Sequence, residues 1–221
     1  MKENRNPTGG KGQRANAVGD PPKIEGRIRE ELMKAALKLF TWRGYAATTV
    51  RELVEEAGVT KPVLYYYFGN KEGLFLELMK THFGRLEAMV DSHRQRAGAV
   101  RERLTAMLHE GFLFAQRDRD FVRLMHAVYF GPPGEAPFFD FDVYHQRYHD
   151  LIARLLEEGI AKGEFPPVNA ADVAWVILGT EEMAIEDQIC NQAPRIDRET
   201  LQRLLDIIFD GLSADRKDRK A

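Results

Sequence analysis

Threonine, arginine and lysine side chains between residues 49 and 71 have the chemistry needed to bind a polyanion. Thr49 and Thr60 each stand directly before a predicted helix, where a hydroxyl group and backbone N–H groups form a phosphate site. Arg51 carries a guanidinium whose fork can bridge O6 and N7 of guanine. Lys71, the first residue of a later predicted helix, is placed for phosphate in a similar way. Each residue taken alone is equally compatible with a plain helix cap or a solvated charge.

Two short helices joined by a tight turn must position these side chains. Thr49 and Glu52 match a capping box, which starts a helix that Gly58 ends after two turns. Thr60 then caps a second short helix, which ends at Gly69. This layout is that of a helix-turn-helix, whose second helix enters the major groove of DNA.

The second short helix has one apolar face and one face rich in tyrosine. On a helical wheel, Leu64 and Phe68 point inward, Lys61 and Val63 lie on the flanks, and Tyr67 falls between the faces. Burying several adjacent tyrosines requires a hydrogen-bond partner for each phenol, so at least some of them are expected at the surface. The outward residues are Pro62, Tyr65 and Tyr66.

The runs 44–51, 57–68 and 71–75 resemble the N-terminal domain of the TetR family of bacterial transcriptional repressors. The resemblance covers residues 28–80 and includes separate motif elements in the family's order and spacing. It implies a homodimer whose two recognition helices bind a palindromic operator in double-stranded DNA. It also implies a C-terminal helical domain that binds a small effector and releases the DNA.

The resemblance assigns roles to individual positions of this sequence. It implies phosphate contacts from Thr49, Thr60, Tyr66, Tyr67 and Lys71, and base or sugar contacts from Arg51, Lys61, Pro62, Val63 and Tyr65. Two departures from the family pattern weaken the expected DNA affinity. First, Pro62 replaces the small residue usual at that position and lacks an N–H. Second, Glu55 and Glu56 place negative charge in the preceding helix, which repels DNA unless the two side chains point away from it.

The composition describes an ordinary globular chain of 221 residues, with 44% hydrophobic and 30% charged residues, which excludes wholesale disorder. The longest apolar stretch is far below the roughly 20 residues of a membrane span, and the start lacks a signal-peptide core, so we expect a cytoplasmic protein without a membrane partner. Cys190 is alone, which excludes an intrachain disulfide. Residues 1–80 hold 14 basic and 10 acidic side chains against 18 and 24 in residues 81–221, so a polyanion is expected to meet the N-terminal part.

Helical periodicity runs through the whole chain and no strand pattern appears, so the fold is predicted to be all-α with about nine helices. Gly131-Pro132-Pro133-Gly134 interrupts the pattern, and Asn169 and Asp197 are expected to cap the last two helices. The predicted organisation is a flexible basic tail over residues 1–26, a helix-turn-helix domain over 27–73, a helical effector-binding and dimerisation domain over 74–213, and a charged tail over 214–221.

Aromatic residues crowd the middle of the larger domain. Such a set suits an apolar pocket with a few polar tips, and a hydrophobic or aromatic effector. For any single residue, a place in a plain helical core is the more probable alternative. The candidate ligand-binding residues are Phe112, Met125, Tyr129, Phe138, Tyr144, Tyr148, Trp175 and Glu181.

His145 and His149 lie four residues apart, a spacing that can hold zinc or nickel, with His126 or Glu181 as a third ligand. Histidines at this spacing are common without metal, so no metal or other cofactor is predicted. The two last helices, 170–191 and 197–213, correspond in the resembled family to the dimer interface, a four-helix bundle.

An enzyme and a protein-binding adaptor are the two alternatives to a DNA-binding regulator. An enzyme is disfavoured because the two serines, Ser92 and Ser213, lie in no strand-turn-helix elbow and no phosphate-binding glycine loop is present. An all-helical adaptor that binds another protein explains the helices but leaves the helix-turn-helix surface unexplained.

Overall fold

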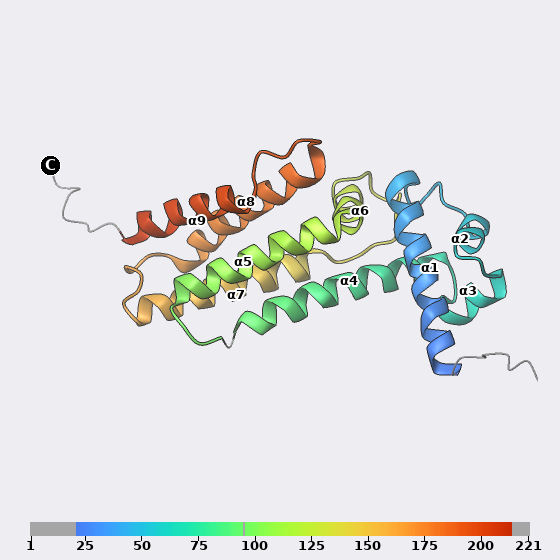
Figure 1. The fold of residues 1–221 in the computed structure, drawn as a ribbon, viewed down its shortest axis with the longest axis horizontal. Helices are drawn as coiled ribbons and strands as arrows, with labels where there is room; N and C mark the ends of the chain where they lie inside the picture. The colour runs from blue at the N-terminus through green and yellow to red at the C-terminus, as the bar shows by residue number, and fades with distance from the viewer. Residues whose placement is uncertain (1–20, 95, 214–221) are drawn as a thin grey trace, which may run out of the picture.

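The computed structural model describes residues 21–94 and 96–213, and within these ranges it contains nine helices and no strand (Figure 1). The predicted all-α fold and number of helices are confirmed. The helices are α1 (Pro21–Arg43), α2 (Val50–Glu56), α3 (Lys61–Phe68), α4 (Lys71–Arg94), α5 (Val100–Arg117), α6 (Arg119–Tyr129), α7 (Asp142–Ala161), α8 (Ala170–Cys190) and α9 (Arg198–Ser213).

α1 begins at Pro21, so residues 21–26, which the sequence places in the flexible tail, are helical. Prolines are compatible with a first helical turn, because the N–H groups they lack have no intrahelical partner there. The rest of the predicted tail, residues 1–20, and the charged tail 214–221 lie outside the described residues.

The first three helices and the start of α4 pack around one apolar centre. Leu32, Leu53, Leu64 and Phe75 are fully buried there and belong to a single cluster. Gly58 makes the turn between α2 and α3 with φ 65°, a left-handed conformation that favours glycine. This conformation allows the N–H of Val59 to donate to the Val54 carbonyl at 2.9 Å. The turn sets the direction of α3 relative to α2.

α4 leaves this three-helix unit and runs beside α5 and α7, while α8 and α9 lie on the other side of α5 (Figure 1). The centre of this larger unit is apolar, with Leu104, Phe112, Ile152, Ile177 and Phe209 fully buried. The predicted domain boundary at residue 74 falls inside α4, so one continuous helix joins the two units.

The junction between the two units is packed with side chains. α6 lies against α1, and the Thr41 hydroxyl donates to the Asp120 carbonyl at 3.0 Å. Phe121 and Phe141 are buried in the same apolar cluster as the centre of the three-helix unit. A displacement of α6 or of the segment before α7 is therefore transmitted by direct contact to α1 and α4.

The expected caps of the last two helices are confirmed. The Asn169 side chain accepts the Ala171 N–H at 3.1 Å, and the Asp197 carboxylate accepts the Thr200 N–H at 2.8 Å. Within the described residues, no helix is long and apolar enough to cross a bilayer.

Candidate functional site

α3 presents one polar and aromatic face to solvent, as the helical wheel predicts. Tyr65 and Tyr66 are 47% and 77% exposed, and Lys61 and Pro62 are exposed beside them. The opposite face is anchored by the fully buried Leu64. The other candidate contacts, Val63 and Tyr67, are half-buried on the flanks, and Phe68 is half-buried where the wheel predicts an inward side chain.

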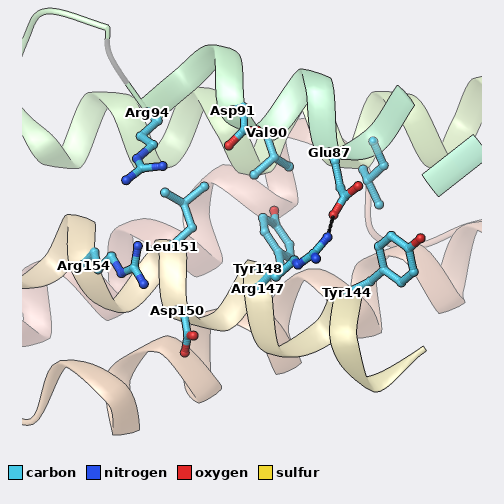
Figure 2. A pocket seen from close by; sticks show the side chains of 11 residues that line it. Glu87, Val90, Asp91, Arg94, Tyr144, Arg147, Tyr148, Asp150, Leu151 and Arg154 are labelled. Carbon is cyan, nitrogen blue, oxygen red and sulfur yellow. Dashed lines mark hydrogen bonds and ion pairs between the residues drawn. The ribbon is translucent and has the colours of Figure 1, made fainter. Parts of the chain in front are cut away.

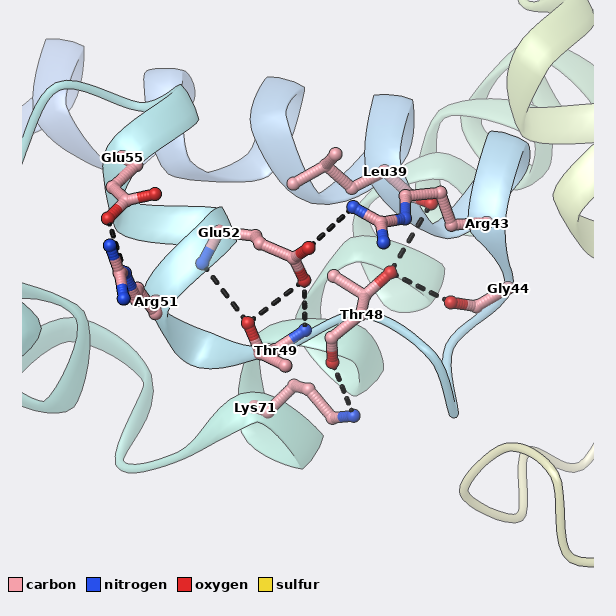
Figure 3. A network of polar contacts seen from close by, with 9 residues as sticks. All are labelled: Leu39, Arg43, Gly44, Thr48, Thr49, Arg51, Glu52, Glu55 and Lys71. Atoms are coloured by element: carbon pink, nitrogen blue, oxygen red, sulfur yellow. Dashed lines mark hydrogen bonds and ion pairs between the residues drawn. The ribbon is translucent and has the colours of Figure 1, made fainter.

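The N-terminus of α2 is closed by its own capping box, which differs from the free phosphate site expected from the sequence (Figure 3). The Thr49 N–H and hydroxyl both donate to Oε2 of Glu52, at 2.8 and 2.9 Å, and Arg43 pairs with the same carboxylate. The hydrogen bonds from Thr49 hold the pKa of Glu52 below its ordinary value. A phosphate at Thr49 must therefore compete with Glu52.

Thr60 occupies the N-cap position of α3, but its side chain makes no capping hydrogen bond. The sequence prediction of a hydroxyl cap is wrong in this respect, because Pro62 removes one of the N–H groups near the start of α3. The exposed Thr60 hydroxyl is thus available to an outside acceptor.

Lys71 contacts the turn between α1 and α2. Its ammonium donates to the carbonyls of Tyr45 and Thr48 at 2.9 and 2.8 Å and lies 4.0 Å from the centroid of the Tyr45 ring. Partial burial lowers the pKa of Lys71. Two of its three protons are used within the protein, so the position of the ammonium is fixed and one donor remains for a phosphate.

Arg51 and the two acids of α2 form ion pairs on the surface. The Arg51 Nε donates to Glu55 at 2.7 Å, with both side chains exposed, and Glu56 pairs with Lys38 of α1 at 2.6 Å. Exposed pairs of this kind contribute little free energy, so a guanine base can replace Glu55 as the partner of Arg51. The pairing of Glu56 with α1 reduces the charge repulsion expected from the sequence.

A second candidate site is a cavity of about 410 Å³ between α4 and α7 (Figure 2). It combines apolar and aromatic walls with three arginines and three acids. Its lining residues are Leu86, Glu87, Val90, Asp91 and Arg94 of α4, and Tyr144, Arg147, Tyr148, Asp150, Leu151 and Arg154 of α7.

Three of the predicted ligand-binding residues lie at this cavity or directly behind it. Tyr144 and Tyr148 line it, and the Tyr148 hydroxyl donates to Oε2 of Glu181 at 2.8 Å. Glu181 is 3% exposed, and its burial raises its pKa to about 8. Its other oxygen, Oε1, has no hydrogen-bond partner among the described residues. Gly111 of α5 makes room for this carboxyl group, because a Cβ there would lie 2.5 Å from Oε1.

The structure does not bring the other predicted ligand residues to the same place. Phe112 is fully buried in the core, and Met125 is half-buried between two apolar clusters. Tyr129 and Phe138 line a separate surface hollow of about 500 Å³ formed by the segment before α7. Trp175 is 57% exposed on α8, where the centroid of its ring lies 4.5 Å from that of His149, with the two rings tilted by 34°.

The arginines and acids that line the cavity were not predicted from the sequence, because the candidate residues were aromatic apart from Met125 and Glu181. Tyr144, Arg147, Leu151 and Arg154 are spaced by three, four and three residues, and therefore share one face of α7. A helix face that alternates arginine with large apolar residues was the signal available in the sequence.

His149 is placed differently from a metal ligand. It is buried, and its Nε2 lies 3.0 Å from the Ala171 carbonyl. His145 has its ring 5.4 Å from that of Tyr129. Among the described residues, no group of three or more His, Cys, Asp or Glu side chains is arranged to hold a metal ion.

Comparison with known proteins gives matches to one family. Residues 32–78 match the model of the bacterial regulatory proteins of the tetR family. The transcriptional repressor KstR2 of Mycolicibacterium smegmatis is 25% identical over 213 residues, which cover 91% of this chain and 98% of that protein. Relatives of 32% to 36% identity match over 19% to 51% of their own length.

Solved structures share the fold along most of the chain. FadR from Bacillus subtilis, in complex with stearoyl-CoA, has a TM-score of 0.66 at 20% identity and covers 82% of this chain and 98% of its own. AibR, in complex with isovaleryl coenzyme A and operator DNA, has a TM-score of 0.61 at 24% identity and covers 84% of this chain and 97% of its own.

The family match coincides with the part of the chain in which α2 and α3 present the exposed tyrosine face. The similarity to a transcriptional repressor extends over nearly the whole length of both proteins. Residues 32–78 thus match the tetR family of bacterial regulatory proteins, and the chain is a DNA-binding transcriptional regulator.

Proposed function

We propose that the protein is a repressor that binds a palindromic operator as a homodimer and leaves it when a small hydrophobic or aromatic effector occupies the C-terminal domain. The exposed face of α3 carries this proposal. Its lysine and tyrosines meet solvent while Leu64 holds the opposite face in the core. Side chains presented in this way on the second helix of a helix-turn-helix reach phosphates and base edges in the major groove.

The DNA contacts divide into two groups. Arg51, Lys61, Pro62, Val63 and Tyr65 meet bases or sugars, and Thr49, Thr60, Tyr66, Tyr67 and Lys71 meet phosphates. The internal hydrogen bonds of Lys71 support its role, because an ammonium already held in place loses less freedom when a phosphate binds. At Thr49, phosphate binding requires the Glu52 carboxylate to move away from the Thr49 N–H.

The homodimer forms through α8 and α9. Trp175, Val176 and Met183 of α8 and Ile207 of α9 are between 55% and 69% exposed. Large apolar side chains gathered on two neighbouring helices are typical of a protein interface. Pairing these helices with those of a second copy covers them and places two α3 helices on one duplex, which matches the two-fold symmetry of a palindrome.

The cavity is coupled to the DNA-binding unit through aromatic contacts. The Tyr144 ring, which lines the cavity, lies 4.3 Å from the ring of Phe83 on α4. Phe83 in turn packs edge-on against Phe121 of α6, whose cluster includes the core of α1–α3. A ligand that displaces Tyr144 therefore moves α4 and α6, which changes the spacing of the two recognition helices.

The protein acts by binding rather than by catalysis, and a regulator of bacterial genes works in the cytoplasm. Stearoyl-CoA and isovaleryl coenzyme A, which are bound in the two structural neighbours, are the first compounds to screen as effectors. The aromatic and apolar walls of the cavity suit an acyl chain.

The direct test is selection of bound duplexes from a random pool by the full-length protein. We expect enrichment of one palindrome, whose affinity falls steeply with salt because phosphate contacts release counterions. Failure to enrich any sequence at low salt contradicts the proposal and favours the helical adaptor.

A further inference from the structure

We infer that the cavity between α4 and α7 binds an organic anion with an apolar body, and that Arg94 and Arg154 hold its charged end. This inference rests on the proposed function and names the class of effector. The apolar part lies along Leu86, Val90 and Leu151 and ends near Tyr148.

The three arginines of the cavity differ in their partners. Arg147 pairs with Glu87 at 2.6 Å. Among the described residues, the guanidinium groups of Arg94 and Arg154 make no hydrogen bond or ion pair within 4.0 Å. They extend from opposite helices toward the same end of the cavity, with Leu151 between them (Figure 2). Two cations facing one space form a site for an anion, which a guanidinium fork can hold through two parallel hydrogen bonds.

Two of the three acids of the lining have hydrogen-bond or ion-pair partners of their own. Glu87 is paired with Arg147. Asp150 accepts a hydrogen bond from the Gln146 amide at 2.8 Å, and in Figure 2 its carboxylate points away from α4. Asp91 also lines the cavity, and the Asp150 carboxylate interacts electrostatically with Arg154. Because neither the Arg94 nor the Arg154 guanidinium forms an ion pair within 4.0 Å among the described residues, both remain able to bind a carboxylate or phosphate.

The end of the cavity with the arginines is held rigidly. The Arg103 guanidinium of α5 donates to the carbonyl of Arg94 at 2.7 Å and pairs with Glu158 of α7. Arg103 is itself 6% exposed. This bridge fixes the C-terminal end of α4 next to α7, so the backbone positions that carry the two arginines are set before a ligand arrives.

The walls beyond the arginines carry apolar side chains beside the Glu87–Arg147 ion pair, and end at the polar pair of Tyr148 and Glu181. Val90 and Leu151 are buried and Leu86 is half-buried, so the sides of the cavity suit a hydrocarbon chain. Tyr148 donates its only proton to Glu181, so its oxygen can still accept a hydrogen bond from a ligand. The inner end thus tolerates a hydroxyl or amide N–H but offers no cation to a second anionic group.

The test is titration of the full-length protein with decanoate, decanol and decanoyl-CoA by calorimetry, each below its micelle concentration. We expect decanoate or decanoyl-CoA to bind at least about tenfold more tightly than decanol, and the preference to shrink as salt rises. Tighter binding of decanoate identifies a carboxylate as the charged group, and tighter binding of decanoyl-CoA identifies the phosphates. Equal binding of all three at every salt concentration overturns the inference.

Arg94→Gln and Arg154→Gln locate the charged end. Each is expected to weaken binding of the preferred anion by about tenfold while leaving decanol unchanged. Arg85→Gln, an exposed position on α4 outside the cavity lining, is the matched control and should bind as the wild type does. Loss of anion binding in all three variants alike would refute the assignment. Operator binding measured on the same samples separates this outcome from failure of the proposed function, because the inference can fail while the palindrome is still bound.

Discussion

Arg51 and Lys71 are both basic, but the structure gives them different freedom. Arg51 is exposed on α2 with a weak surface partner in Glu55, whereas Lys71 is tied to two carbonyls of the preceding turn. A free guanidinium can align with a base edge, and a fixed ammonium acts as a point charge beside the phosphate backbone.

Replacement of each residue by alanine should therefore change DNA binding in a different way. Arg51→Ala is expected to cost about 1–3 kcal/mol on the operator and to relax discrimination at one base pair. Lys71→Ala should weaken operator and random duplexes about equally and reduce the salt dependence by about one counterion. Affinities for the operator, single-base variants and random DNA distinguish the two. Equal losses on operator and random DNA for Arg51→Ala would argue against base recognition.

Glu181 is a buried acid whose protonated form is favoured because burial destabilises the charged carboxylate. Because burial raises its pKa to about 8, the folded protein keeps a proton that the unfolded chain releases above about 4.5. The folded state binds more protons than the unfolded state between these values, so this group makes stability fall as pH rises from about 4.5 to 8.

Glu181→Gln removes this pH dependence and keeps a group able to accept from Tyr148. Relative to wild type, the variant should gain roughly 1 kcal/mol of unfolding free energy per pH unit between about pH 6 and 8. Urea unfolding across this range measures the difference, with the exposed Glu186→Gln on the same helix as the control. A difference that stays constant with pH would mean that Glu181 titrates normally.

At the scale of elements, the turn between α2 and α3 depends on one backbone conformation. Gly58 has φ 65°, and a Cβ added there would meet no atom within 4 Å. A side chain at position 58 would therefore reduce stability through the left-handed backbone conformation alone, and not through steric contact with neighbouring atoms.

Gly58→Ala should therefore destabilise the protein by about 1 kcal/mol. Gly84 lies within α4, where a Cβ is also unobstructed, so Gly84→Ala should stabilise by about 0.5–1 kcal/mol. Thermal and urea unfolding of the two variants provide the measurement. Destabilisation by both substitutions would show that an unseen contact, rather than the left-handed backbone, controls each site.

Local signals in the sequence predict most elements because caps and glycine turns act over three or four residues. The capping box at Thr49, the stop at Gly58 and the cap at Asn169 all lie where the pattern places them. The cavity was harder to predict, because its walls come from α4 and α7, whose lining residues are at least fifty positions apart in sequence. Likewise, the sequence does not distinguish an aromatic residue that faces the core, such as Phe112, from one that faces solvent, such as Trp175.

At the scale of the whole molecule, α8 and α9 carry the exposed apolar residues that the proposed dimer covers. Met183 and Ile207 are 55% and 69% exposed, and burying each should contribute roughly 1–3 kcal/mol to association. A charge at either position would have to be desolvated in the interface.

Met183→Glu and Ile207→Glu are thus expected to raise the dimer dissociation constant at least about a hundredfold without unfolding the monomer. Sedimentation equilibrium gives the constant, and circular dichroism reports the fold. Val143→Glu, at an exposed position at the start of α7, is the control. Unchanged association in both α8 and α9 variants would place the interface elsewhere.

The exposed face of α3 is proposed to recognise one specific duplex sequence. This recognition is measured most directly by the affinity of the full-length protein for the selected palindrome and for a shuffled duplex at about 50 and 200 mM salt. We predict a preference of at least about a thousandfold for the palindrome, with affinity for both duplexes falling steeply as salt rises. Equal affinity for the two duplexes, or binding indifferent to salt, would contradict the account.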